Sequence, residues 1–228
     1  MEPIFGSDDI KKKMPLEHRK FEMIDRFIRT INEVFFKDPQ LWDGVDGDKM
    51  KNDFDTSNKS LDQIQKSLQD YLETKKKYFP RFYFLSDEQL LEILSQSRDP
   101  TMVQKHVNKC FEAINLLQFD DKELVYGMIS PENEIVPLSA TIDVNDPDKK
   151  GHVEKWLLEI ENQMKATLRQ ISKESNTDLT ERNLWVQKYP AMVVLAINMI
   201  RWTFNVEQSI KSLEHSPNSV FDLQETLN

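Results

Sequence analysis

Along most of this chain, apolar residues recur at intervals of three and four, which is the spacing of one buried face of a helix. The first such run begins at Pro15, a residue suited to the first turn of a helix, and closes at Asp38-Pro39. We therefore expect an amphipathic helix here. The apolar face comprises Phe21, Ile24, Phe27, Ile28, Ile31, Val34 and Phe35.

The clearest pattern lies between residues 49 and 79, where apolar positions alternate steps of four and three in a heptad seam. Ser57 and Lys75 interrupt the seam. A helix of this length would extend roughly 46 Å, about the diameter of a compact globule of this chain length, so the pattern favours a rod-like body. An ordinary long helix of a bundle would carry the same pattern. Pro80 should end the helix, because the residue before a proline is disfavoured in the helical region.

Two signals downstream indicate helix starts. Ser86-Asp87-Glu88-Gln89 has the form of a capping box, in which the first and last side chains bond each other's backbone amides. Asp99-Pro100 combines an N-cap residue with proline at the first helical position. Between Pro80 and the capping box, Phe82-Tyr83-Phe84 is interpreted as a short extended stretch.

The pattern then changes to segments rich in Val, Ile, Tyr and Thr, which predict a β-hairpin over residues 123–142. Its turn is Ser130-Pro131-Glu132-Asn133, and Pro137 marks an edge or a bulge. Two strands alone are marginal in water, so the hairpin must pack on helices or pair with a neighbour.

The polar segment 143–151 predicts a loop and separates a first helical section, residues 1–142, from a second, residues 152–215. The second section contains an amphipathic helix from Val153, a shorter one over 179–188, and a last helix that begins at Pro190. The start of the last helix is apolar on nearly every face, so we expect it to be the most buried. The tail, residues 216–228, is expected to fray. Packing roles are predicted for Trp156, Trp185 and Trp202.

These patterns predict a mainly α protein, an elongated array of helical bundles with one inserted β-hairpin. The net charge of -9 argues against nucleic acid and anionic membranes as partners. The most apolar run, Ala191 to Ile200, is about half of the roughly 20 residues that a membrane span requires. Cys110 is the one cysteine, so an intrachain disulfide is excluded and a reducing compartment is favoured. A soluble, cytosolic protein is expected.

Residues for catalysis or for cofactor binding are missing from the sequence. The five glycines do not form a phosphate-binding loop. The acidic run 43–48 fails as a calcium loop, because Val45 and Phe54 occupy ligand positions. The histidines His18, His106, His152 and His215 lack metal-binding spacing, and Cys110 lies on an apolar helix face. We therefore expect no catalytic residue, no metal and no cofactor in this segment.

The aromatic residues around the end of the long helix are more numerous than a helix end requires. Beside Tyr78, the cluster comprises Phe79, Pro80, Arg81, Phe82, Tyr83 and Phe84. Two interpretations stay open: a core junction between helices, or a docking surface for a partner.

The same cluster lies within a run from Asp70 to Ser95, followed by Asp99-Pro100, that closely resembles the linker of dynein heavy chains, the axonemal type more than the cytoplasmic. Three later stretches resemble the family in order and spacing: Lys109 to Ile114, Val153 to Leu157, and Trp185-Val186 followed by Tyr189-Pro190. Where the family commonly has glutamine two residues after that proline, this chain has Met192.

This resemblance implies part of a rod of helical bundles that bends over a ring of ATPase modules and drives movement along microtubules. ATP and Mg²⁺ would bind in the ring, outside this segment. The implied partners are the ring modules of the same heavy chain and, through the parent molecule, intermediate and light chains; the implied location is the cytoskeleton of the ciliary axoneme. Candidate hinges are Pro80, Gly151 and Pro190. The alternative is a helical adaptor that self-associates through Leu61, Ile64 and Leu68 on the seam of the long helix.

Overall fold

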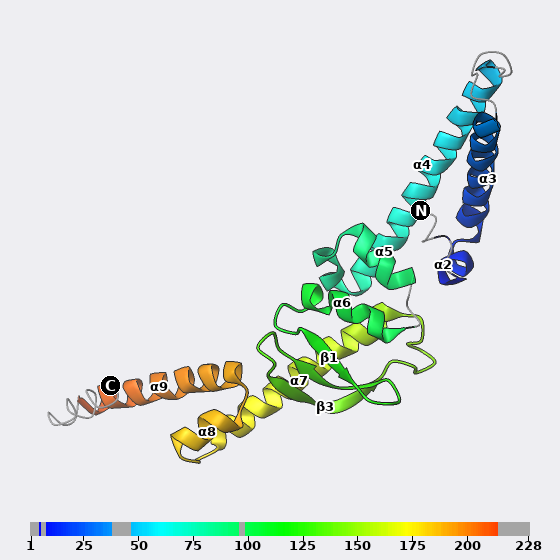
Figure 1. Ribbon diagram of the computed structural model, residues 1–228. Coiled ribbons are helices and arrows are strands. Elements are labelled where there is room, and N and C mark those ends of the chain that lie inside the picture. The colour runs from blue at the N-terminus through cyan, green and yellow to red at the C-terminus, as the bar shows by residue number, and fades with distance from the viewer. Residues whose placement is uncertain (1–4, 6–7, 38–46, 96–98, 214–228) are drawn as a thin grey trace.

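The computed structural model describes residues 5, 8–37, 47–95 and 99–213. The molecule is elongated: a two-helix arm projects from one end of a central body, and two further helices lie at the other end (Figure 1). Helices dominate, and one small antiparallel sheet is inserted among them. The predicted fold class is confirmed.

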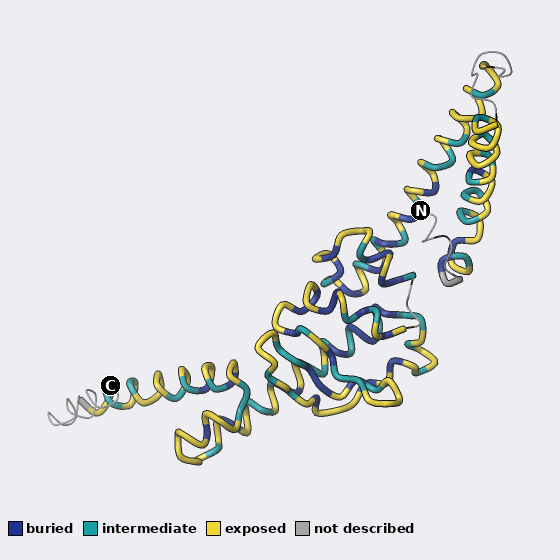
Figure 2. Tube along the Cα trace, in the orientation of Figure 1, coloured by how far each residue is buried: buried dark blue, intermediate teal, exposed yellow. Residues whose placement is uncertain are grey.

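The arm consists of α3 (Pro15–Lys37) and α4 (Gly47–Tyr78), which lie side by side, and the short helix α2 (Asp8–Lys13) lies at its base (Figure 1). The predicted start at Pro15 is confirmed, and the helix expected over residues 49–79 spans 47–78. A small core of Phe5, Ile10, Ile24 and Ile64 fastens the arm near its base. Further out the two helices are largely exposed (Figure 2).

The central body begins with the 3-10 helix η1 (Pro80–Phe84) and continues with α5 (Asp87–Ser95) and α6 (Pro100–Cys110). The extended conformation predicted for residues 82–84 is wrong, because buried Phe82 turns the chain back onto the core. The capping box is confirmed: Ser86 Oγ accepts from the Gln89 amide at 3.3 Å, and the Ser86 amide donates to Gln89 Oε1 at 3.2 Å. The Asp99 carboxylate accepts from the Thr101 amide at 2.9 Å, which confirms the second predicted helix start.

In the described part of the chain, β1 (Leu116–Phe119), β2 (Leu124–Ile129) and β3 (Ile135–Asp143) form a three-stranded antiparallel sheet in the order β1-β2-β3. The predicted hairpin corresponds to β2 and β3, and β1 is an additional strand. Helices cover both sheet edges with side chains that imitate a neighbouring strand. Gln104 on α6 donates to the Leu117 carbonyl at 2.7 Å and accepts from the Leu117 amide at 2.9 Å. On the opposite edge, the Ser139 amide donates to Thr167 Oγ1 at 2.9 Å. At Leu117 and Ser139, edge groups of the backbone are thus paired rather than left open to another strand.

The main core lies between α4, α5, α6, the sheet and α7 (Val153–Thr177), where the dark blue residues concentrate in Figure 2. Phe79, Phe82, Val125, Ile142 and Ile160 are fully buried in it. Within this core, Lys75 of α4 forms a buried ion pair with Glu154 of α7. Lys75, which interrupts the heptad seam, is therefore paired with an acidic side chain in the core.

The far end comprises α8 (Arg182–Lys188) and α9 (Ala191–Leu213). The expectation that the last helix would be the most buried is wrong: Val193 and Ile197 are its buried apolar residues among those described. The packing role predicted for Trp202 is also wrong, because its side chain is 43% exposed, whereas Trp156 and Trp185 are each 2% exposed. The reason is tertiary: α7 and α8 cover one side of α9 near its start. The predicted tail, residues 216–228, and most of the acidic run 43–48 lie outside the described residues.

Candidate functional site: an aromatic junction and a helical elbow

The inner half of the aromatic cluster joins α4 to the core. Phe79 and Phe82 are both fully buried, with ring centres 5.0 Å apart in an edge-to-face arrangement. Phe79 also lies against Phe111, at the end of α6, with ring centres 6.0 Å apart. Pro80, the first residue of η1, is exposed.

Arg81 ties this junction to two other helices. Its Nη1 donates to the Cys110 carbonyl at 3.0 Å, and its Nε lies 3.4 Å from Glu161 Oε2 on α7. The guanidinium carbon is 4.8 Å from the ring centre of Phe111, a cation–π geometry. One side chain thus links η1, α6 and α7.

The outer half of the cluster faces outward. Tyr83 and Phe84 are 54% and 70% exposed, and Tyr78 is 49% exposed. The Tyr83 hydroxyl donates to Glu73 Oε2 at 3.1 Å, and Lys76 donates to Asp87 at 2.7 Å. The hydrogen bond to Asp87 raises the pKa of Lys76 above its ordinary value. The six residues singled out in the sequence therefore form one continuous segment with a buried side and an exposed side.

The Lys75–Glu154 pair lies beside this junction. Burial alone would raise the pKa of Glu154, but the hydrogen bond and charge of Lys75 outweigh burial and lower that pKa below its ordinary value. His152 Nδ1 lies 3.3 Å from the same carboxylate oxygen. The paired carboxylate is thus held ionised between α4 and α7.

A second constellation closes the C-terminal end of α7, and local sequence patterns did not reveal it. Arg201 of α9 donates to the carbonyls of Ser175, Asn176 and Asp178 at 2.7, 2.9 and 2.8 Å. Its guanidinium carbon is 4.8 Å from the ring centre of Trp185, whose Nε1 donates to the Ser175 carbonyl at 3.0 Å. A cation at a helix C-terminus satisfies free carbonyls and complements the helix dipole. We call this contact the Arg201 clasp.

The Asp178 carboxylate holds the connection between α8 and α9. It accepts from Lys188 Nζ and from the Tyr189 hydroxyl, each at 2.7 Å, and from the Thr180 amide at 2.9 Å. The hydrogen bond from Lys188, followed by those from Thr180, lowers the pKa of Asp178 well below its ordinary value. The partners Lys188 and Tyr189 lie ten and eleven residues away from Asp178, so the local sequence pattern did not reveal these contacts.

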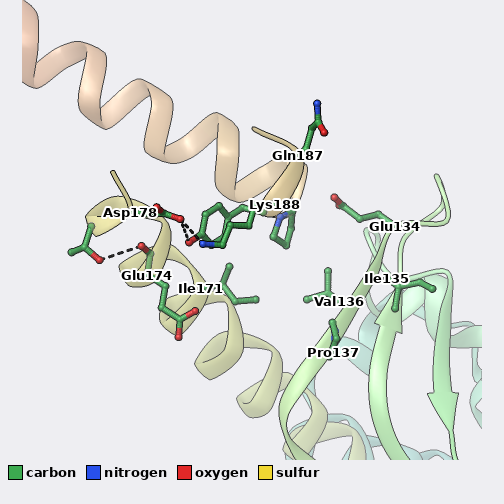
Figure 3. Close-up of a pocket in the computed structure, with 12 residues that line it drawn as sticks. Glu134, Ile135, Val136, Pro137, Ile171, Glu174, Asp178, Gln187 and Lys188 are labelled. Carbon is green, nitrogen blue, oxygen red and sulfur yellow. Dashed lines mark hydrogen bonds and ion pairs between the residues drawn. The ribbon is translucent and has the colours of Figure 1, made fainter. Parts of the chain in front are cut away.

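We call the connection between α8 and α9, Tyr189-Pro190, the elbow. An open cleft of about 780 Å³ separates the elbow from the start of β3 (Figure 3). Ile135, Val136 and Pro137 line one side, and Ile171, Glu174 and Lys188 lie on the other. At its rim, the backbone amide of Ala191, the first residue of α9, donates to Glu134 Oε1 at 2.9 Å. The residue just before β3 thus contacts the start of α9 through its carboxylate.

Each of the three candidate hinges lies at a boundary between elements. Pro80 is the first residue of η1, just after the end of α4, and Pro190 separates α8 from α9 at the rim of the cleft. Gly151 lies in the loop before α7 with φ of 74°, a left-handed backbone conformation that favours glycine.

Over the residues the structure describes, no group of three or more His, Cys, Asp or Glu side chains is placed to hold a metal ion. Cys110 is buried, and burial raises the pKa of its thiol to about 12, so the thiolate is scarce near neutral pH. Of the helices in the described ranges, none is both long enough and apolar enough to cross a bilayer.

Comparisons with known proteins identify the family. The profile "Dynein heavy chain, N-terminal region 2" matches residues 1–175. The chain is 41% identical to human dynein axonemal heavy chain 3 over 213 residues, which is 92% of this chain and 5% of that protein. It is 39% identical to rat dynein axonemal heavy chain 1 over 216 residues, which is 93% of this chain and 5% of that protein, and 36% identical to mouse dynein axonemal heavy chain 12 over 236 residues, which is 98% of this chain and 8% of that protein. The chain therefore spans less than a tenth of the length of these relatives, and it belongs to the dynein heavy chain family, to the N-terminal region that this profile describes.

Proposed function

We propose that this segment is part of the mechanical linker of a dynein heavy chain, a lever that transmits conformational change of the motor ring into movement along microtubules. The observation that carries the proposal is an elongated body whose long helices are locked to one another at defined junctions (Figure 1). A lever must be stiff along most of its length and must bend at few places.

Stiffness comes from contacts between helices far apart in the sequence. The Lys75–Glu154 pair joins α4 to α7, and Arg81 joins η1 to α6 and α7. Phe79 and Phe82 fill the space between them. Because an ion pair, hydrogen bonds and apolar packing coincide at this junction, we expect α4 and α7 to move as one rigid unit when a force acts on the arm.

Bending is assigned to the elbow at Pro190. Pro80 and Gly151 flank elements of the large main core, so movement there would open many buried contacts. The start of α9, in contrast, rests on a small cluster built around Trp185, Val193 and Ile197, beside the open cleft. Regions with few buried apolar contacts open at the lowest free-energy cost. The Arg201 clasp connects α9 to the C-terminal end of α7 and thereby restricts the angle between these two helices.

No catalysis is assigned to this segment: ATP and Mg²⁺ would bind in the ring modules of the parent heavy chain. The proposed partners are those modules and, through the parent molecule, the intermediate and light chains. Because the relatives are axonemal heavy chains by name, the proposed location is the ciliary axoneme.

The alternative, an adaptor that self-associates through the seam of α4, has less support. Ile64 is buried against Phe5, Ile10 and Ile24, and Leu68 belongs to the main core. The seam is thus largely occupied by the chain's own residues.

The test compares microtubule gliding velocity with the rate of ATP turnover in the full heavy chain. Arg201→Ala removes the clasp and should lower microtubule gliding velocity several-fold, while ATP turnover per motor is retained. The matched control is Arg182→Ala, which changes an exposed arginine at the start of α8. A parallel loss of turnover and velocity, or no change in either, would contradict the lever.

A further inference from the structure

One wall of the cleft beside the elbow is the outer edge of β3. The strand order β1-β2-β3 leaves this edge without a neighbouring strand among the described residues, and Figure 3 shows it facing the cleft. The Glu134 carbonyl accepts from the Ser130 amide, at the end of β2, at 2.9 Å and so points toward β2. Because successive residues of a strand turn their backbone groups to opposite sides, those of Ile135 and Pro137 point away from β2. The Ser139 amide, two residues further on, points outward as well and donates to α7.

Three backbone groups on this edge are available to another strand. They are the Ile135 amide, the Ile135 carbonyl and the Pro137 carbonyl, and no hydrogen bond from the loops or side chains of the described residues reaches them. Pro137 lacks an amide hydrogen, but its nitrogen faces outward, so the ladder with β2 loses nothing. An extended peptide can therefore bond to this edge through its own backbone, the mode of binding called β-strand addition.

The opposite wall supplies contacts for the side chains of such a peptide. Ile171 of α7 and Val136 of β3 are both half-buried, and they line the cleft from its two sides (Figure 3). Glu174 lies one turn further along α7 and is exposed. Its carboxylate accepts from the neutral Gln170 amide at 3.0 Å, and no ion pair joins it to a cation in the described part of the chain. The volume of about 780 Å³ lies in the usual range of ligand sites.

The charge of the cleft favours a basic peptide. Its lining includes the carboxylates of Glu134, Glu174 and Asp178, and Lys188 is the cation among the lining residues. Lys188 is already paired with Asp178 at 2.7 Å, so the charges of the other two carboxylates are not balanced by a lysine or arginine of the cleft. Residues two positions apart lie on the same face of a strand, so an apolar side chain can contact Ile171 while a basic one contacts Glu174.

We propose that the cleft binds an extended peptide of another polypeptide as an added strand beside β3, with an apolar and a basic residue two positions apart. The segments 38–46 and 214–228 of this chain contain neither lysine nor arginine, so they lack the basic residue. A second copy of the chain is a poor source, because both copies carry a net charge of -9 and repel each other. The occupant is therefore a different protein with a basic, extended segment.

The experiment measures the binding of a fluorescent peptide to the full heavy chain by fluorescence anisotropy. The probe has the order arginine, threonine, valine, threonine, arginine, so that it presents the required spacing in either strand direction. Saturable binding is expected. Glu174→Lys should weaken this binding about five-fold, because it replaces an attraction by a repulsion. Glu112→Lys, the same change at an exposed position outside the cleft, should alter the affinity less than about two-fold.

Two methylated forms of the probe test the backbone hydrogen bonds without altering the protein. A strand donates to one neighbour through every second amide. Methylation of the amide nitrogens in one alternate set should therefore abolish binding, and methylation of the other set should preserve it.

Three results would overturn the proposal. The absence of saturable binding would mean that the cleft is closed to a peptide or is filled by the heavy chain itself. Equal effects of Glu174→Lys and Glu112→Lys would assign the binding to net charge, and equal effects of the two methylated forms would exclude an added strand. Because neither gliding nor ATP turnover is measured, this site can fail while the lever stands, and the lever can fail while the site stands.

Discussion

Separating the buried ion pair of Lys75 and Glu154 should destabilise the chain more than any exposed ion pair would. The two side chains are 10% and 6% exposed and connect α4 to α7. Lys75→Met leaves a carboxylate in the core without its cation, and Glu154→Leu leaves an ammonium there. Breaking one side of a buried pair costs about 3–5 kcal/mol, because the remaining charge stays desolvated.

The structure also indicates what the double variant should do. When both partners become apolar, no charge is left behind, and such replacements are often neutral or stabilising. The Lys75→Met/Glu154→Leu variant should therefore recover most of the lost stability. A loss of 3 kcal/mol changes the unfolding constant roughly 150-fold and, for a chain of this size, lowers the melting temperature by about 6–12 °C.

The assay is urea and thermal unfolding of the chain, followed by circular dichroism. Asp25→Asn is the control, since it breaks the exposed pair with Arg29 at 2.7 Å and should cost less than about 1 kcal/mol. The reasoning is refuted if either single variant costs no more than the control, or if the double variant loses as much as the two single variants together.

Acidification provides an independent check on the same pair. The folded pKa of Glu154 is lowered, so its stabilisation is complete above the unfolded value of about 4.3 and is lost as pH falls through the folded value. Relative to the double variant, the wild type should lose stability as the pH falls below about 5; an equal loss in both would contradict this. Thr167→Val leaves the Ser139 amide unpaired and should cost about 1–3 kcal/mol in urea unfolding, whereas exposed Thr177→Val should cost far less. Cys110 should react with a thiol reagent at pH 7.5 only after unfolding, because burial holds its thiol protonated, and rapid labelling of the native chain would be the opposite result. Arg201→Lys keeps the charge but loses the planar guanidinium that lies over the Trp185 ring, so the distribution of distances between spin labels on α7 and α9 should broaden. An unchanged distribution would show that charge alone holds the elbow.

The sequence predicted helix boundaries correctly where they depend on interactions between residues close together in the chain. Pro80 ends α4, whose last residue is Tyr78, and the capping box at Ser86 starts α5, because both act through the backbone of nearby residues. The strand β1 was missed because it is four residues long, and its exposed edge is paired by Gln104 from α6. A partner outside the strand cannot be seen in the strand's own pattern.

The candidate site shows the same division. The aromatic cluster at Phe79 to Phe84 was visible as composition, but which side faces the core depends on Phe111 and Glu161, which come later in the chain. The Arg201 clasp joins residues 23 to 26 positions apart, so no periodicity reveals it. The burial predicted for α9 was wrong because apolar composition alone does not show how much of a helix the other described elements cover.

The central claim, a lever that bends at Pro190 and is stiff elsewhere, is tested most directly by single-molecule energy transfer in the full heavy chain. One dye pair joins Lys173 on α7 to Gln208 on α9 and reports the elbow; a second joins Lys66 on α4 to Lys173 and reports the rigid junction. Through the nucleotide cycle, the first distance should change and the second should stay constant. A constant distance across the elbow, or a change between α4 and α7, would contradict the account.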